Sequence, residues 1–139
     1  MAALTIERLP DFFGQYAGRR TIDVKAAVKV FKGAMVAIDS SGNAMPAGLL
    51  AGGTIRAVGI ASATYDNTAG GAAAFKVECQ PGIFKFLNHG ADLVTKASVG
   101  ALCYIVDDQT VALTNGTATR APCGIVQQVD SDGVRVLIA

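Results

Sequence analysis

The chain has 139 residues, of which 51% are apolar, 17% charged and 6% aromatic. This length supplies one core, and the apolar content is too high for a disordered chain. The 12 basic and 11 acidic side chains leave a formal net charge of +1. That balance argues against a dedicated nucleic-acid binder, which usually presents a basic face. No apolar run approaches the roughly 20 residues of a membrane-spanning helix, so no membrane partner is expected.

Small residues make up much of the apolar fraction. The chain has 16 glycines and no tryptophan, and alanine is its most frequent residue. Because an alanine face buries little apolar area per residue, we expect a partner copy to complete part of the core. The first residues do not show a basic start followed by an apolar stretch and a small-residue cleavage site, so we expect a soluble protein that is not secreted.

Residues 1–21 differ from the rest and are predicted to form an extended N-terminal arm. They hold a proline, two glycines and three of the aromatic residues without clean periodicity. A solvated arm does not need such aromatics, so the arm docks either on a neighbouring subunit or another protein, or on its own domain. For the arginines of this segment, a solvated arm is the favoured interpretation. The alternatives are docking on an acidic protein surface and docking on encapsidated nucleic acid. The residues predicted to contact a subunit or partner are Phe12, Phe13, Tyr16, Arg19 and Arg20.

From residue 22 onward, alternation with a period of two predicts β-strands. Apolar and charged residues alternate over 22–30, which predicts one half-buried strand. Further strands are expected at 34–39, 44–50, 54–64, 75–80 and 83–87, with Gly59 as a bulge or close-packing point and a corner at Pro81-Gly82. The stretch 88–100 predicts a loop with at most one helical turn.

The C-terminal third predicts two hairpins. Strands at 101–106 and 110–113 flank Asp107-Asp108-Gln109, and strands at 124–129 and 134–138 flank a turn at 130–133. Eight to ten short strands favour a sandwich or barrel. The predicted fold is mainly β: a single-domain antiparallel β-sandwich, jelly-roll-like, over residues 22–139.

Residues that carry chemistry are few. His89 is the only histidine, and the cysteines Cys79, Cys103 and Cys123 are odd in number and widely spaced, which favours buried free thiols over disulfides or a Cys–His nucleophile. No closely spaced Cys or His pairs predict zinc. The acidic pairs fall where hairpins need turn residues. We therefore expect no enzyme, no catalytic residues, no metal and no cofactor.

Phe84 and Phe86 flank Lys85. This arrangement could stack bases as single-strand binders do, which would make the chain a β-barrel module for a small ligand or single-stranded nucleic acid. Core packing is the favoured interpretation, because the chain is nearly neutral and no direct contact with nucleic acid is expected.

The order of these segments resembles the capsid cement, or decoration, proteins of tailed bacteriophages and prophages. The resemblance covers roughly residues 22–138 and is carried by turn and strand signatures. These signatures are a Gly-then-aromatic strand (82–86), a Val-Gly before a Tyr strand (99–104), an Asp-Asp turn before Thr-Val (107–111), a Gly-Ile-Val strand (124–126) and an Asp-Gly-Val hairpin (132–134). The earlier segment 29–39, with Gly33 before a strand and a turn at Gly42 after it, is also similar.

The resemblance implies a structural virion protein. Such a protein is made in the host cytoplasm and binds the outer surface of an icosahedral capsid, where it cements neighbouring major capsid protein subunits. It acts as a homo-oligomer, and we favour a dimer over a trimer. Many weak copies would act together on the symmetric shell, which needs no catalytic site. A phage head-fibre or tail accessory protein is the alternative within the structural class.

Overall fold

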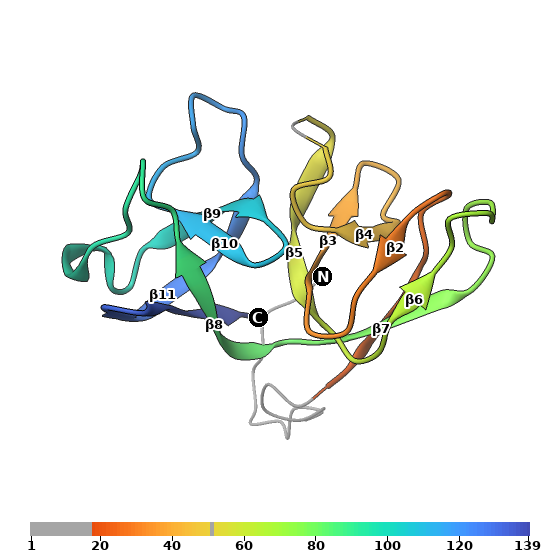
Figure 1. Ribbon diagram of the computed structural model, residues 1–139, viewed down its shortest axis with the longest axis horizontal. Helices are drawn as coiled ribbons and strands as arrows, with labels where there is room; N and C mark the ends of the chain where they lie inside the picture. Colours follow the sequence, from red (N-terminus) through yellow and green to blue (C-terminus); the bar gives the residue numbers. More distant parts are fainter. Residues whose placement is uncertain (1–17, 51) are drawn as a thin grey trace, which may run out of the picture.

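The computed structural model describes residues 18–50 and 52–139. Phe12, Phe13 and Tyr16 of the predicted arm lie outside the described residues. The prediction of a mainly β, antiparallel fold is confirmed, because about half of the residues lie in strands and almost all strand pairs are antiparallel. Figure 1 shows two lobes, an open sheet and a closed barrel, with β7 running directly into β8 between them.

The first lobe is a five-stranded sheet covered by a small two-stranded one. Its strand order is β1 (Arg20–Asp23), β7 (Lys76–Gln80), β5 (Thr54–Ala61), β3 (Met35–Asp39) and β4 (Ala44–Pro46), and the small sheet pairs β2 (Lys29–Val30) with β6 (Tyr65–Asp66). Every pair in the five-stranded sheet is antiparallel.

The second lobe is a closed five-stranded barrel. Its order is β10 (Thr110–Ala112), β8 (Gly82–Asn88), β12 (Gly133–Ile138), β11 (Pro122–Asp130) and β9 (Leu102–Asp107), and the 3-10 turn η1 (Lys96–Ser98) precedes β9. β10 closes the barrel because it pairs parallel with β8 on one side and antiparallel with β9 on the other. The jelly-roll-like sandwich stays a prediction; the arrangement observed is a sheet packed beside a barrel.

The sheet is buried on both faces because it lies between the barrel and the loops of its own lobe. Along β3, Met35 and Ala37 join the barrel residues in one core cluster, whereas Val36 packs with Val24 and Val77 in a second cluster on the other face. A strand buried on both faces reads as a continuous apolar run, which accounts for the sequence of β3.

Small residues bring the lobes together. Ala37, Ala47 and Ala57 are buried in the cluster shared with the barrel. Gly48 lies against β9, since a Cβ built on it would be 2.6 Å from the Asp107 Cα and 2.7 Å from the Val106 carbonyl oxygen. The high alanine and glycine content therefore serves close contact between backbones within this chain.

The predicted single strand over 22–30 is wrong, because a turn divides it into β1 and β2. Ala27 adopts a left-handed conformation with φ 58°. The buried Asn67 amide holds this turn, donating at 2.9 Å to the Lys25 carbonyl and at 3.0 Å to the Gly71 carbonyl. Val24, Val28 and Val30 are buried on the two sides of the turn, whereas Ala26 and Ala27 are both exposed. Ala26 continues the run of apolar residues at even positions, and this is why the sequence pattern conceals the turn.

The remaining strand predictions agree with the observed elements to within a few residues, except that β4 ends at Pro46 and not at 50. The Gly59 prediction is confirmed: the pairing register shifts beside it, and a Cβ there would lie 2.7 Å from the Gln80 carbonyl oxygen. The expected helical turn is η1. In the part of the chain that the structure describes, no helix is long and apolar enough to cross a membrane.

Candidate functional site

Two of the five predicted contact residues, Arg19 and Arg20, lie in the described part of the chain. The Arg19 guanidinium is 2.6 Å from a Glu78 carboxylate oxygen on β7 and is largely exposed. Arg20 begins β1 and donates at 2.8 Å to the Val58 carbonyl. These bonds fasten the start of β1 to its neighbours, so Arg20 is anchored within the sheet and Arg19 remains accessible beside it.

The prediction of buried free thiols is confirmed. Cys79, Cys103 and Cys123 are all buried, and none of them forms a disulfide. Burial raises the pKa of the Cys79 thiol, which opposes a thiolate nucleophile. The Cys123 thiol lies 3.7 Å from the Met35 sulfur in the shared core. Among the hydrogen bonds of the described residues, none joins His89 to a thiol, and the His89 amide donates to the Val111 carbonyl.

The acidic pairs act as turn residues. The Asp107 carboxylate accepts the Gln109 amide at 2.9 Å, which fixes the β9–β10 turn. Asp132, in the β11–β12 turn, forms an ion pair with Lys85 of β8. Across residues 18–50 and 52–139, no group of three or more His, Cys, Asp or Glu side chains is placed to hold a metal ion.

A groove lies where the sheet meets the barrel. Its central cavity has a volume of about 430 Å³ and is lined by Gly33 and Ile60 from the sheet lobe and by Phe84, Leu87 and Asp108 from the barrel. Two further hollows share lining residues with it: one contains Phe31 and shares Gly33 and Asp108, and the other contains Leu93 and shares Leu87. The three adjoining hollows are together called the groove here.

The groove carries exposed apolar side chains. Phe31 is 56% exposed, and Leu87 and Leu93 are each 52% exposed. The Lys29 ammonium lies 4.9 Å from the centre of the Phe31 ring, which holds that ring in place. Exposed apolar side chains gathered around a hollow are typical of a surface that binds another protein.

Carboxylates add polarity to the groove. Burial and the neighbouring Asp107 raise the pKa of Asp108, whereas the hydrogen bond from Lys85 lowers the pKa of Asp132. The groove thus combines apolar walls with the Asp108 carboxylate and the Lys85–Asp132 ion pair. It can accept apolar side chains and, at the carboxylates, a basic side chain or a backbone N–H group.

Phe84 and Phe86, a possible base-stacking pair from the sequence, are part of the core. Phe86 is buried, and Phe84 is half-buried against the same cluster. Core packing is confirmed for Phe86. Both rings also line the central cavity together with Lys85, so the base-stacking interpretation stays an untested alternative.

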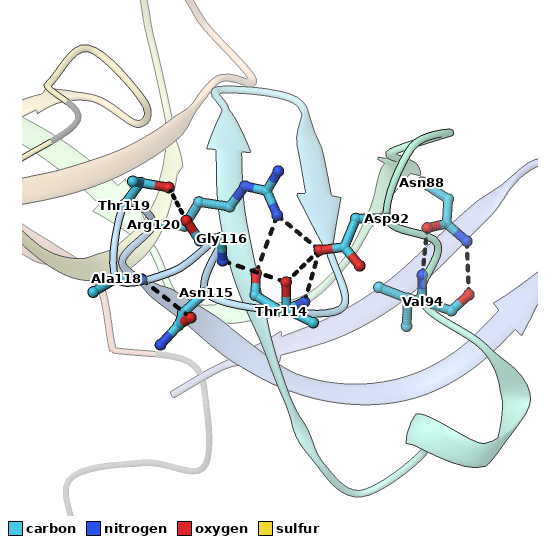
Figure 2. A network of polar contacts seen from close by, with 9 residues as sticks. All are labelled: Asn88, Asp92, Val94, Thr114, Asn115, Gly116, Ala118, Thr119 and Arg120. Atoms are coloured by element: carbon cyan, nitrogen blue, oxygen red, sulfur yellow. Dashed lines mark hydrogen bonds and ion pairs between the residues drawn. The ribbon is translucent and has the colours of Figure 1, made fainter.

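Figure 2 shows a polar network that ties together two loops at the end of the barrel, residues 88–101 and 113–121. One Asp92 carboxylate oxygen accepts from the Thr114 hydroxyl at 2.6 Å, the Thr114 amide at 3.1 Å and the Arg120 guanidinium at 2.8 Å. The Thr114 bonds, with the Arg120 charge, lower the pKa of Asp92. The Asn88 side chain forms a reciprocal pair with the backbone of Val94 in the first loop.

The sequence analysis missed the exposed apolar residues of β8. Ile83 and Leu87 share one face of the strand with Lys85, while Phe84 and Phe86 occupy the core face. The signal available in the sequence was that apolar residues occupy both the even and the odd positions of this strand, and therefore both of its faces. Such a pattern leaves one apolar set without a place in the strand's own core.

Comparisons of the chain with protein-family models, with curated proteins and with solved structures find no match.

Proposed function

We propose that this chain is a structural virion protein that binds the outer surface of a tailed-phage capsid and cements neighbouring major capsid protein subunits. The observation that carries the proposal is the groove between the lobes, whose three hollows are lined by the exposed Phe31, Leu87 and Leu93 together with the carboxylates of Asp108 and Asp132. Such a surface suits binding to another protein.

The resemblance to cement proteins supplies the identity of the partner. Most of its signatures fall on one structural unit, since residues 82–86, 99–104, 107–111, 124–126 and 132–134 lie in or beside strands of the barrel, whereas the similar segment 29–39 lies in the sheet lobe. The jelly-roll-like sandwich belongs to this proposal, as do the homo-oligomer and the location on the virion surface. Binding in many copies to a symmetric shell would let a modest groove contribute strongly through avidity.

The first experiment measures the protein composition of gradient-purified particles of the phage or prophage that encodes the chain. We expect this 14.2 kDa chain at a copy number comparable to that of the major capsid protein. A few copies per particle would favour the head-fibre or tail accessory alternative. Absence from particles would overturn the proposal and return attention to a ligand-binding barrel.

The groove is tested by particles lacking the chain, to which purified protein is added back. Leu87→Asp should weaken binding at least tenfold, because it places a charge in the apolar wall. Leu49→Asp is the matched control, since Leu49 is similarly exposed, at 50%, and lies on the loop after β4, away from the groove. Equal binding by both variants would remove the groove from the capsid interface.

A further inference from the structure

One edge of β8 is paired along only part of its length. On one side β12 pairs with β8 from Gly82 to Phe86, and on the other side β10 pairs with it at Leu87 and Asn88 alone. Among the strands that the structure describes, none pairs with β8 before Leu87 on the side that faces away from β12. The barrel therefore closes only through the end of β8.

The directions of the backbone groups along β8 show which of them lack a neighbouring strand. The Leu87 amide donates at 2.8 Å to a carbonyl of the β9–β10 turn, so it points away from β12. The Phe86 carbonyl points toward β12, since a Cβ built on Gly133 of that strand would lie 2.7 Å from its oxygen. Because these directions alternate along a strand with a period of two, the N–H and C=O groups of Ile83 and Lys85 point away from β12.

The Ile83 and Lys85 backbone on this side, the free edge, borders the groove. No hydrogen bond of the described residues reaches the free edge, and Phe84, Lys85 and Leu87 line the central cavity beside it. Lysine commonly guards a strand edge against pairing, but here the Lys85 ammonium is held by the Asp132 carboxylate. The free edge thus offers the N–H and C=O groups of both residues to an extended chain.

The charge of Asp108 indicates what kind of chain fits the groove. Its carboxylate lines the central cavity and joins no ion pair among residues 18–50 and 52–139, whereas Asp132 is already paired with Lys85. A lysine or arginine side chain would form a charge-assisted hydrogen bond with Asp108. The exposed Phe31 and Leu87 line the same groove, so the occupant should combine apolar side chains with a basic one.

We propose that an extended segment of the major capsid protein, with apolar side chains and at least one basic side chain, binds the groove as an added strand along the free edge of β8. In strand addition, main-chain hydrogen bonds supply affinity and alternate side chains supply specificity. The inference rests on the proposed function, because it takes its partner from there. A free edge of two residues admits only a short strand, which suits a contact that is weak singly and strong in many copies.

Hydrogen exchange at single amides tests the added strand. The full chain is exchanged free and bound to particles that lack it, and both samples are then dissolved in a solvent that halts exchange and read by nuclear magnetic resonance. In the free chain the Ile83 and Lys85 amides should exchange rapidly, whereas those of Phe84 and Phe86, which face β12, should be protected. On the particles, exchange at Ile83 and Lys85 should slow by about tenfold or more, because both amides then donate to the added strand.

The outcomes separate this inference from the proposed function. Binding to the particles without slower exchange at Ile83 and Lys85 would overturn the added strand and leave the capsid function standing. No binding at all would overturn the proposed function, and the inference with it. Slow exchange of both amides already in the free chain would also overturn the inference, because the free edge would then be covered by this chain itself or by a second copy.

Two substitutions of Lys85 separate the backbone from the side chain. Lys85→Pro removes an N–H group that faces the groove and keeps the bonds of β8 to β12, and proline is tolerated at a strand edge. It should weaken binding to the particles about fivefold more than Lys85→Ala, which keeps the N–H group. Circular dichroism and thermal unfolding establish that both variants are folded, and equal binding by the two would contradict the added strand.

The basic side chain of the partner is tested at Asp108. Asp108→Asn should weaken binding about tenfold, because the charge-assisted bond is lost. Asp23→Asn is the matched control, since it makes the same change of net charge on β1, outside the groove. Equal binding by both variants would overturn the assignment of a basic side chain to the groove.

Discussion

Asp39 shows how one buried carboxylate fixes a turn. Its oxygens accept the Ser41 and Asn43 amides, each at 2.9 Å, and the Lys25 ammonium at 2.9 Å. Burial opposes the charged form, but these donors outweigh it and lower the pKa of Asp39. The charged state of this side chain therefore stabilises the β3–β4 hairpin.

Asp39→Asn should lower the free energy of unfolding at pH 7 by about 2 kcal/mol, because charge-assisted bonds to a buried group are lost. A carboxyl with a lowered folded-state pKa stabilises above its unfolded pKa of about 3.9 and loses that contribution as the pH falls through the folded value. The difference between wild type and variant should therefore shrink below about pH 4. Urea unfolding across pH measures this, with the exposed Asp23→Asn as a control that changes stability little.

The three thiols should react slowly with a disulfide exchange reagent in the native state. Cys79 and Cys103 are fully buried and Cys123 is 5% exposed, so reaction requires opening of the fold. All three should react at once in denaturant. Rapid reaction of one thiol under native conditions would contradict this prediction and would show that the fold opens locally around that thiol.

At the level of elements, the turn between β1 and β2 carries strain. Ala27 has a φ of 58°. In this left-handed region a residue with a Cβ is destabilised by about 1 kcal/mol, whereas glycine adopts it without steric cost. Ala27→Gly should raise the free energy of unfolding by about 0.5 kcal/mol. Ala26→Gly, at the exposed position next to it, should lower the free energy of unfolding, because glycine raises the conformational entropy of the unfolded chain and relieves no strain there. Thermal unfolding of the pair tests the assignment, and a destabilised Ala27→Gly would contradict it.

The strands that the sequence predicted well are those with strong local signals. Pro81-Gly82 and the Asp-rich turns separate runs of alternating apolar and polar residues, and the observed strands β7 to β12 coincide with those runs. The break at Ala27 is invisible locally because Asn67, forty residues later, holds it. The groove is likewise formed by residues distant in sequence, such as Gly33 and Asp108. Its exposed walls could be suspected only from the doubly apolar pattern of β8.

At the scale of the whole molecule, the contact between lobes depends on backbone approaching backbone. Gly48 and Gly42 have similar left-handed conformations, with φ +83° and +80°. A Cβ on Gly48 would meet the β9 backbone at 2.6 Å, whereas one on Gly42 would meet nothing within 4 Å. The two positions therefore separate the cost of backbone conformation from the cost of crowding the lobes.

Gly42→Ala should lower the free energy of unfolding by about 1 kcal/mol, the cost of a Cβ in this conformation. Gly48→Ala should carry that cost and about 2 kcal/mol more, because rigid backbone atoms must move apart. Guanidinium unfolding of both variants measures the difference. If the lobes unfold as one unit, Gly48→Ala will shift a single transition. A second transition in that variant would mean that the barrel and the sheet hold their structures separately, and equal effects at the two glycines would contradict the close approach.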